Sequence, residues 1–226
     1  MISALLIDLD DTLYDERSYV LSGFRAVAGE LARRHPQLDA ETLAAGMEAE
    51  LDANGRGRIF DVVLERAGLP SDMIGDMIRV YREHRPVISL WPGVADTLRL
   101  LAKTYRLAIV TDGLALMQAR KVEALGVADL VDEVLLCWEH GAPKPDPACY
   151  LEAMRRLGAQ PAQTVVFGDN PGHDTAAAAA AGCRSIRIRS GRFAAESHGD
   201  FPPDAEVARF TEVAPVLADL EAGAQA

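Results

Sequence analysis

Six side chains that could do chemistry stand at or just beyond the ends of short apolar runs in this sequence. They are Asp8, Asp10, Thr111, Lys144, Asp169 and Asp174. Carboxylates can ligate a divalent cation, attack an electrophile or transfer a proton, and a lysine can offset the charge of an anion. Each residue taken alone could be ordinary, because an aspartate after a strand often forms a turn or caps a helix. Their combination is informative only if the fold brings them together.

Short apolar runs alternate with helical patterns over most of the chain. The predicted strands cover 4–7, 107–110, 134–136, 165–167 and 185–188. The predicted helices cover 92–101, 118–125, 147–157, 174–181 and 213–220, and the chain between 188 and 213 is predicted to be a loop. This alternation predicts an α/β fold with a doubly wound parallel sheet. Because ligands bind beyond the carboxyl ends of such strands, we expect the six side chains to meet at one rim of the sheet.

The stretch 17–89 has a different pattern. Apolar residues recur there at spacings of three and four, which is typical of amphipathic helices. One such series is Val20, Phe24, Val27 and Leu31. The stretch interrupts the strand and helix alternation after its first strand, so it is an insertion. We therefore predict a Rossmann-like core domain formed by 1–15 and 90–226 and a helical cap domain over 16–89.

Composition and charge exclude several classes of function. The chain has 226 residues, of which 49% are hydrophobic and 25% charged, so it can bury a core without disulfides or structural zinc. Its formal net charge of −11 would repel a nucleic-acid backbone, and we expect no nucleic-acid partner. We also expect no signal peptide and no membrane partner. The three cysteines form no CxxC pair, which predicts a reducing, cytoplasmic location.

Four short motifs follow one another in a characteristic order. They are DLDDT at 8–12, VTDG at 110–113, PKPDP at 143–147 and GDNPGHD at 168–174. The series resembles the haloacid dehalogenase-like superfamily, whose pattern is DxDx(T/V), a hydroxyl residue, a lysine and GDxxxxD. The resemblance covers 4–189. It implies a core with strand order 3-2-1-4-5, and it identifies the helical insertion with the all-helical cap that many members carry.

The resemblance also implies roles for individual residues. Asp8 corresponds to the nucleophile that becomes phosphorylated, and Asp10 corresponds to the general acid and base. The carboxylates of Asp8 and Asp169 and the backbone carbonyl of Asp10 would bind Mg²⁺, with Asp174 as a further ligand. Hard oxygen ligands suit this ion. We therefore expect Mg²⁺ as the cofactor.

Positive charge is needed because a carboxylate that attacks a phosphate dianion is repelled by it. Two unit charges about 4 Å apart repel by about 4 kcal/mol at an effective dielectric constant near 20. Lys144 would supply charge beside the metal ion. The hydroxyl of Thr111, together with Asp112 and Gly113, would bind the transferring phosphoryl group. The family often has asparagine in place of Asp112, so we assign no catalytic role to the Asp112 side chain.

The resemblance predicts a Mg²⁺-dependent phosphomonoester hydrolase that acts on a small phosphorylated metabolite through an aspartyl-phosphate. Asp10 favours this reaction over dehalogenation, because the 2-haloacid dehalogenases usually lack the second aspartate. A Schiff-base mechanism of the phosphonoacetaldehyde hydrolase type is disfavoured, since no lysine occurs between residues 1 and 102. Two alternatives stay open: a phosphotransferase or phosphomutase of the same superfamily, and a catalytically silent binding protein with this fold.

Specificity is expected to come from the helical insertion. Arg56 and Arg58 stand in a glycine-containing loop there and are candidates for substrate binding. His173, inside the last motif, is unusual and receives no assigned role. We expect the protein to be a monomer or a homodimer.

Overall fold

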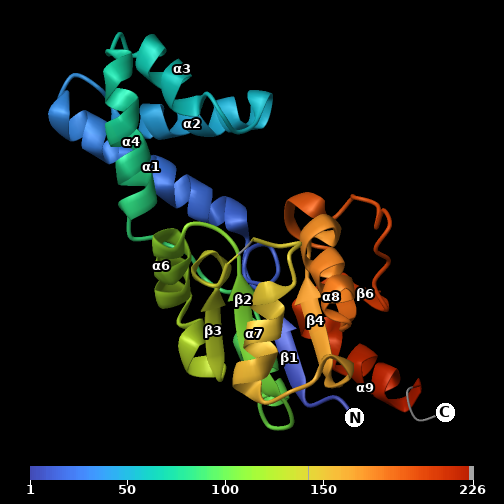
Figure 1. The fold of residues 1–226 in the computed structure, drawn as a ribbon. Helices are drawn as coiled ribbons and strands as arrows, with labels where there is room; N and C mark the ends of the chain where they lie inside the picture. The colour runs from blue at the N-terminus through green and yellow to red at the C-terminus, as the bar shows by residue number, and fades with distance from the viewer. Residues whose placement is uncertain (142, 224–226) are drawn as a thin grey trace. The chain divides into compact units, whose positions relative to one another are not determined.

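The computed structural model describes residues 1–141 and 143–223. Their contacts divide the chain into two compact units (Figure 1). The first, which we call the core unit, combines residues 1–16 with the chain from residue 89 onward. The second, which we call the helical unit, comprises Arg17–Ile88. Each unit has a hydrophobic core of its own.

A six-stranded parallel sheet forms the centre of the core unit. Its strands are β1 Ala4–Ile7, β2 Arg106–Thr111, β3 Glu133–Leu136, β4 Thr164–Gly168, β5 Arg184–Ile188 and β6 Ala205–Val207. They lie in the order β3-β2-β1-β4-β5-β6, so the predicted order of the first five strands is confirmed. The last strand, β6, falls where a loop is predicted, because three residues are too few to display a strand pattern.

Helices cover both faces of this sheet, as expected for parallel strands that are buried on two sides (Figure 1). They are α5 Val94–Leu101, α6 Ala115–Leu125, α7 Ala148–Leu157, α8 Ala176–Ala181 and α9 Val213–Gly223. On one face, Leu6 and Val166 belong to a cluster with the apolar side chains of α7 and α8. On the other face, the ring of Phe167 meets that of Phe210, with centroids 5.8 Å apart. The sheet is therefore packed between two helical layers.

Four of these helices begin one to three residues from the predicted position, and α5 and α7 are displaced by two residues and one residue. The helix expected from Gln118 begins at Ala115, three residues earlier. The alanine-rich helix expected from Asp174 begins at Ala176, because Pro171–Thr175 form a π-helical turn. Asp174 lies within this π-helical turn. Its side chain therefore faces the rim of the sheet and does not cap α8.

The strand register aligns the segments that carry the motifs. Ile7 of β1 pairs with Ile109 of β2 on one side and with Phe167 of β4 on the other. The three strands end within two residues of these positions, at Ile7, Thr111 and Gly168, so the segments that follow leave the sheet at nearly the same level. This alignment is what brings residues more than 150 positions apart in the sequence to a common rim.

The helical unit is built from four α-helices among its described residues. They are α1 Glu16–Arg34, whose first residue belongs to the core unit, α2 Ala40–Asn54, α3 Ile59–Arg66 and α4 Ile74–Glu83. Their apolar faces enclose a core that includes Phe24, Leu31, Met47 and Met77. The three- and four-residue spacing of apolar residues thus forms amphipathic helices, as predicted.

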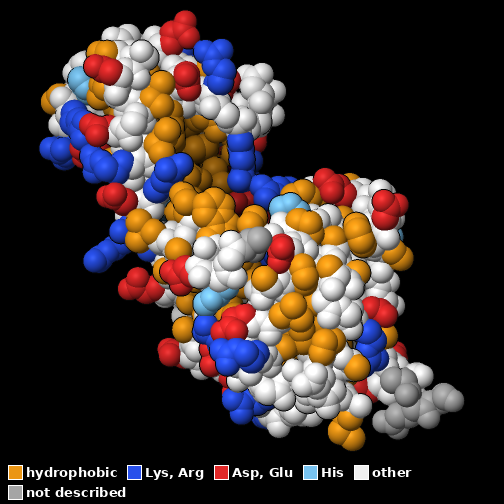
Figure 2. Space-filling view, viewed as in Figure 1, with side chains coloured by type: hydrophobic (Ala, Val, Ile, Leu, Met, Phe, Trp, Pro, Cys, Tyr) orange, Lys and Arg blue, Asp and Glu red, His pale blue; other side chains and the backbone are white. Residues whose placement is uncertain are grey.

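Charged side chains of both signs are interspersed on the visible face of each unit (Figure 2). That face carries no continuous basic surface of the kind that tracks a phosphate backbone. Within 1–141 and 143–223, no helix combines the length and the apolar character that a membrane-spanning segment needs.

Candidate active site

A cavity of about 80 Å³ lies in the core unit at the carboxyl ends of the central strands. Its lining residues are Asp8, Asp10, Asp11, Asp112, Lys144, Asp169, Asn170, His173, Asp174, Arg192 and Phe193. Five of the six side chains singled out from the sequence are in this lining. The sixth, Thr111, is fully buried at the end of β2.

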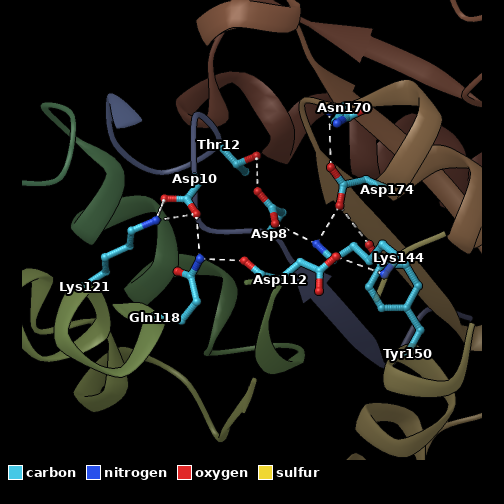
Figure 3. A network of polar contacts seen from close by, with 10 residues as sticks. All are labelled: Asp8, Asp10, Thr12, Asp112, Gln118, Lys121, Lys144, Tyr150, Asn170 and Asp174. Carbon is cyan, nitrogen blue, oxygen red and sulfur yellow. Dashed lines mark hydrogen bonds and ion pairs between the residues drawn. The ribbon is translucent and has the colours of Figure 1, made fainter. Parts of the chain in front are cut away.

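Lys144 joins two of the carboxylates in this cavity (Figure 3). Its Nζ lies 2.7 Å from Oδ1 of Asp8 and 2.7 Å from Oδ1 of Asp174. The second oxygen of Asp8 accepts a hydrogen bond from the Thr12 hydroxyl at 3.3 Å, and Asp174 accepts another from the Tyr150 hydroxyl at 3.1 Å. Although burial favours the neutral amine, the carboxylates of Asp174 and Asp8 raise the pKa of Lys144 well above its usual value. Lys144 is therefore a fixed positive charge.

Asp169 completes a cluster of three buried carboxylates with Asp8 and Asp174. One oxygen from each of them can be chosen so that all three lie within 4.8 Å of one another. Oδ2 of Asp169 is buried and has no hydrogen-bond partner among the described residues. Burial, with the charges of Asp8 and Asp174, raises the pKa of Asp169 to about 10, and burial also raises the pKa of Asp8 to about 7. Lys144 alone does not balance three carboxylates, and a divalent cation with oxygen ligands fits this cluster.

Glycine at position 168 lets the Asp174 carboxylate reach the end of β4. A Cβ on Gly168 would overlap that carboxylate. The backbone N–H of Asn170 then donates to Oδ2 of Asp174 at 3.2 Å, which fixes the second oxygen. In the last motif, Gly168 is thus required for packing, whereas Asp169 contributes a carboxylate to the cluster.

Asp10 is held by a separate set of partners (Figure 3). Lys121 is only 3% exposed, and its Nζ lies 2.7 Å and 2.8 Å from the two carboxylate oxygens of Asp10. Gln118 donates to Asp10 at 3.1 Å, and the Tyr14 hydroxyl donates to it as well. Although burial would raise the pKa of Asp10, the charge of Lys121 lowers it. Two carboxylates two residues apart in the sequence are therefore paired with two different lysines.

The second motif serves the cavity in an unexpected way. Oδ2 of Asp112 accepts the backbone N–H of Lys144 at 3.0 Å, so this carboxylate fastens the loop that carries the lysine. The Gln118 amide donates to the Asp112 carbonyl at 2.5 Å, and Gly113, with φ +126°, leaves room for that amide. The Thr111 hydroxyl has no partner among the described residues.

Two of the proposed substrate-binding residues lie outside this cavity's unit. Arg56 and Arg58 are exposed in the helical unit, between α2 and α3, and stay predictions. Conversely, Arg192 lines the cavity, although the sequence predicts no role for it. A single arginine after a strand usually faces solvent, so no signal in the sequence marks it.

Comparison with known proteins decides the family. The sequence model of the haloacid dehalogenase-like hydrolase family matches residues 2–182. The chain belongs to this family. Glyceraldehyde 3-phosphate phosphatase from Methanopyrus kandleri is 31% identical over 230 residues, which cover 97% of this chain and 99% of the relative. Phosphoserine phosphatase from Thermus thermophilus is 29% identical, with coverages of 83% and 88%.

A solved structure is also similar to this haloacid dehalogenase-like hydrolase. A 2-haloacid dehalogenase from Pseudomonas syringae pv. Tomato is 32% identical, with a TM-score of 0.69, and the match covers 97% of this chain and all of that one. The relatives thus include enzymes named for phosphate esters and one named for a haloacid. Membership of the family alone leaves the leaving group open, and the residues of the cavity must decide it.

Proposed function

We propose that this hydrolase is a Mg²⁺-dependent phosphomonoesterase that acts on small phosphorylated metabolites through a phosphorylated Asp8. The observation that carries the proposal is that two carboxylates in one cavity have separate lysine partners: Asp8 lies against Lys144, and Asp10 lies against Lys121. One carboxylate can then attack while the other transfers a proton. Displacement of a halide needs the first carboxylate only, because a halide leaves without a proton.

In the first step, an oxygen of Asp8 attacks phosphorus and the bond from phosphorus to the ester oxygen breaks. Asp10, protonated by the water of the preceding turnover, gives this proton to that oxygen, so the product leaves as an alcohol. Lys144 offsets the negative charge that Asp8 and the phosphoryl group bring together. The buried hydroxyl of Thr111, which no described residue satisfies, supports a role in binding a phosphoryl oxygen.

In the second step, water attacks phosphorus and the bond from phosphorus to Asp8 breaks. Asp10 takes a proton from the water, inorganic phosphate leaves, and Asp8 returns as a carboxylate. Lys121 supports this step because its charge stabilises the anionic form of Asp10, which is the form that accepts a proton.

Three carboxylates and one carbonyl would hold the cation. They are the side chains of Asp8, Asp169 and Asp174 and the backbone carbonyl of Asp10. When bound, Mg²⁺ would supply positive charge against the oxygens of the substrate phosphate. The unpartnered Oδ2 of Asp169 supports this assignment, because a buried carboxylate oxygen without a donor is costly unless a cation faces it.

Release of inorganic phosphate tests the proposal. The panel comprises glyceraldehyde 3-phosphate, phosphoserine, phosphoglycolate, sugar phosphates and nucleotides, each with Mg²⁺ and with EDTA. We expect turnover of at least one ester that EDTA abolishes and that Asp8→Asn removes. Asp200→Asn, which changes an exposed carboxylate of the same unit, should retain full activity. Full activity in Asp8→Asn would contradict the proposal.

The same samples separate the alternatives. An isomerised sugar phosphate without net release of phosphate would indicate a phosphotransferase. Halide release from 2-chloropropionate would indicate the reaction for which the Pseudomonas structure is named. Binding of phosphate esters without any turnover would indicate a silent binding protein.

A further inference from the structure

The loop that follows β5 forms a wall of the cavity that the reaction described above does not use. Arg192 and Phe193 in this loop line the cavity together with Asp8, Lys144 and Asp169. The loop is part of the core unit, so its position relative to these carboxylates is set within one compact body.

A fully buried arginine fastens this loop. Arg187 in β5 has no exposed surface. Its guanidinium donates to the backbone carbonyls of Phe193 at 2.7 Å, Glu196 at 3.0 Å and Asp169 at 3.3 Å. Burying a cation is costly unless its N–H donors are satisfied. Here these donors bind backbone carbonyls of the loop and of the segment that follows β4. Arg187 thus ties the loop to the strand end that carries Asp169.

Asp11 holds the loop from the opposite side. Its carboxylate is buried and accepts the backbone N–H of Arg192 at 3.2 Å, and its carbonyl accepts the hydroxyl of Ser190 at 2.5 Å. Asp11 has φ +55°, an unusual value for a residue other than glycine. A Cβ on Gly191 would overlap the Asp11 carboxylate, so the loop closes against this residue without space to spare.

The side chain that this arrangement presents is a cation. The described residues that line the cavity include one lysine, Lys144, and one arginine, Arg192. Lys144 is buried between Asp8 and Asp174, whereas the side chain of Arg192 is 50% exposed. The guanidinium carbon of Arg192 lies 4.7 Å from the centre of the Phe193 ring, and Nη1 of Arg192 lies 3.5 Å from Oε2 of Glu16. Stacking on an aromatic ring orients the guanidinium but leaves its N–H groups able to bind a ligand.

We propose that Arg192 is a specificity-determining residue that binds a second anionic group of the substrate. This inference rests on the proposed phosphomonoesterase function. The backbone of Arg192 is fastened to Asp11, the neighbour of Asp10, and Asp10 acts at the leaving oxygen. The second anion is therefore carried by the leaving part of the substrate, and the preferred substrates are phosphomonoesters that bear a carboxylate or another phosphoryl group there. A guanidinium pairs with either group through two parallel hydrogen bonds.

Matched substrates test this assignment. 2-Phosphoglycolate carries a carboxylate, 1,2-ethanediol bisphosphate carries a second phosphoryl group, and ethyl phosphate carries neither. We expect Arg192→Gln to lower kcat/KM about 10- to 100-fold for a substrate with the second anion, mainly through KM, because charged hydrogen bonds contribute on that scale. The value for ethyl phosphate should change less than about threefold, and Arg192→Lys should recover part of the loss. Which of the two anionic substrates is affected more identifies the group that Arg192 binds.

A binding measurement keeps this inference separate from the catalytic proposal. Calorimetry compares 3-phosphonopropionate with propylphosphonate, whose P–C bonds are not hydrolysed. Arg192→Gln should weaken the binding of 3-phosphonopropionate about 10-fold or more and leave the affinity for propylphosphonate unchanged. This result does not depend on whether the enzyme turns over any ester. Arg209→Gln, an exposed arginine of the same unit that is not in this lining, is the matched control. Equal effects of Arg192→Gln on both phosphonates, or no effect on either, would overturn the assignment.

Discussion

Lys121 determines which form of Asp10 is stable. Its ion pair with both Asp10 oxygens favours the carboxylate, although burial works in the opposite direction. We expect Lys121→Met to slow the second step, because the proton-accepting form loses its stabilising charge. The value of kcat should fall about tenfold or more, within the range that general acid–base groups contribute. Phosphorylated enzyme should also accumulate in acid-quenched samples. Lys103→Met, at an exposed lysine, is the control, and wild-type kcat in Lys121→Met would refute this role.

Two of the buried carboxylates, Asp8 and Asp169, make stability depend on pH and on divalent cation together. Their environment raises the pKa of Asp8 from 3.8 to about 7 and that of Asp169 from 3.8 to about 10. Between pH 4 and these values the folded state binds more protons than the unfolded chain. Without a cation, these two groups therefore lower the free energy of unfolding as the pH rises through this window.

Bound Mg²⁺ should reverse that loss, because it stabilises the deprotonated carboxylates of the folded state. We expect Mg²⁺ to raise Tm more at about pH 8 than at about pH 5.5, where protons compete for the same oxygens. Thermal unfolding with Mg²⁺ and with EDTA measures this difference. Asp169→Asn should lose most of the Mg²⁺ effect, whereas Asp200→Asn should keep it. A Mg²⁺ effect on Tm that does not change with pH would contradict the assignment of these ligands.

At the scale of single elements, the end of β4 is tightly packed. A methyl group at position 168 has no space beside the Asp174 carboxylate. We expect Gly168→Ala to displace that carboxylate from Lys144, to lower Tm and to reduce activity by about 100-fold or more, the scale of a loss of active-site geometry. In α2 a Cβ on Gly46 meets nothing within 4 Å. Gly46→Ala should therefore retain activity and stabilise the helix by about 0.5–1 kcal/mol. Equal activity in both variants would contradict the packing argument.

The elements that deliver the motifs are readable from the sequence, and the elements that support them are not. Short apolar runs mark β1, β2 and β4, and each ends in a residue of the cavity or directly before one. The loop after β5 carries no such pattern, because Arg187 is satisfied by backbone carbonyls that only the folded chain brings to it. The sequence does not show that Lys121 pairs with Asp10, because the two residues are 111 positions apart.

At the scale of the whole molecule, the strand order follows from the family resemblance, and the comparisons confirm the family. The sequence does not show which side chains hold the residues of the cavity in place. Asp112 is an example, because in the sequence it stands only as a departure from the asparagine that is frequent in the family. In the structure its oxygen accepts the backbone N–H of Lys144, so the carboxylate positions the lysine loop.

The central claim is that Asp8 carries the phosphoryl group during turnover. Acid quench of the enzyme during hydrolysis of a good substrate, followed by peptide mass spectrometry, measures this directly. The account predicts phosphate on the peptide that contains Asp8, its loss when substrate is exhausted, and its absence in Asp8→Asn. Phosphate on a different side chain, or turnover in Asp8→Asn at the wild-type rate, would contradict it.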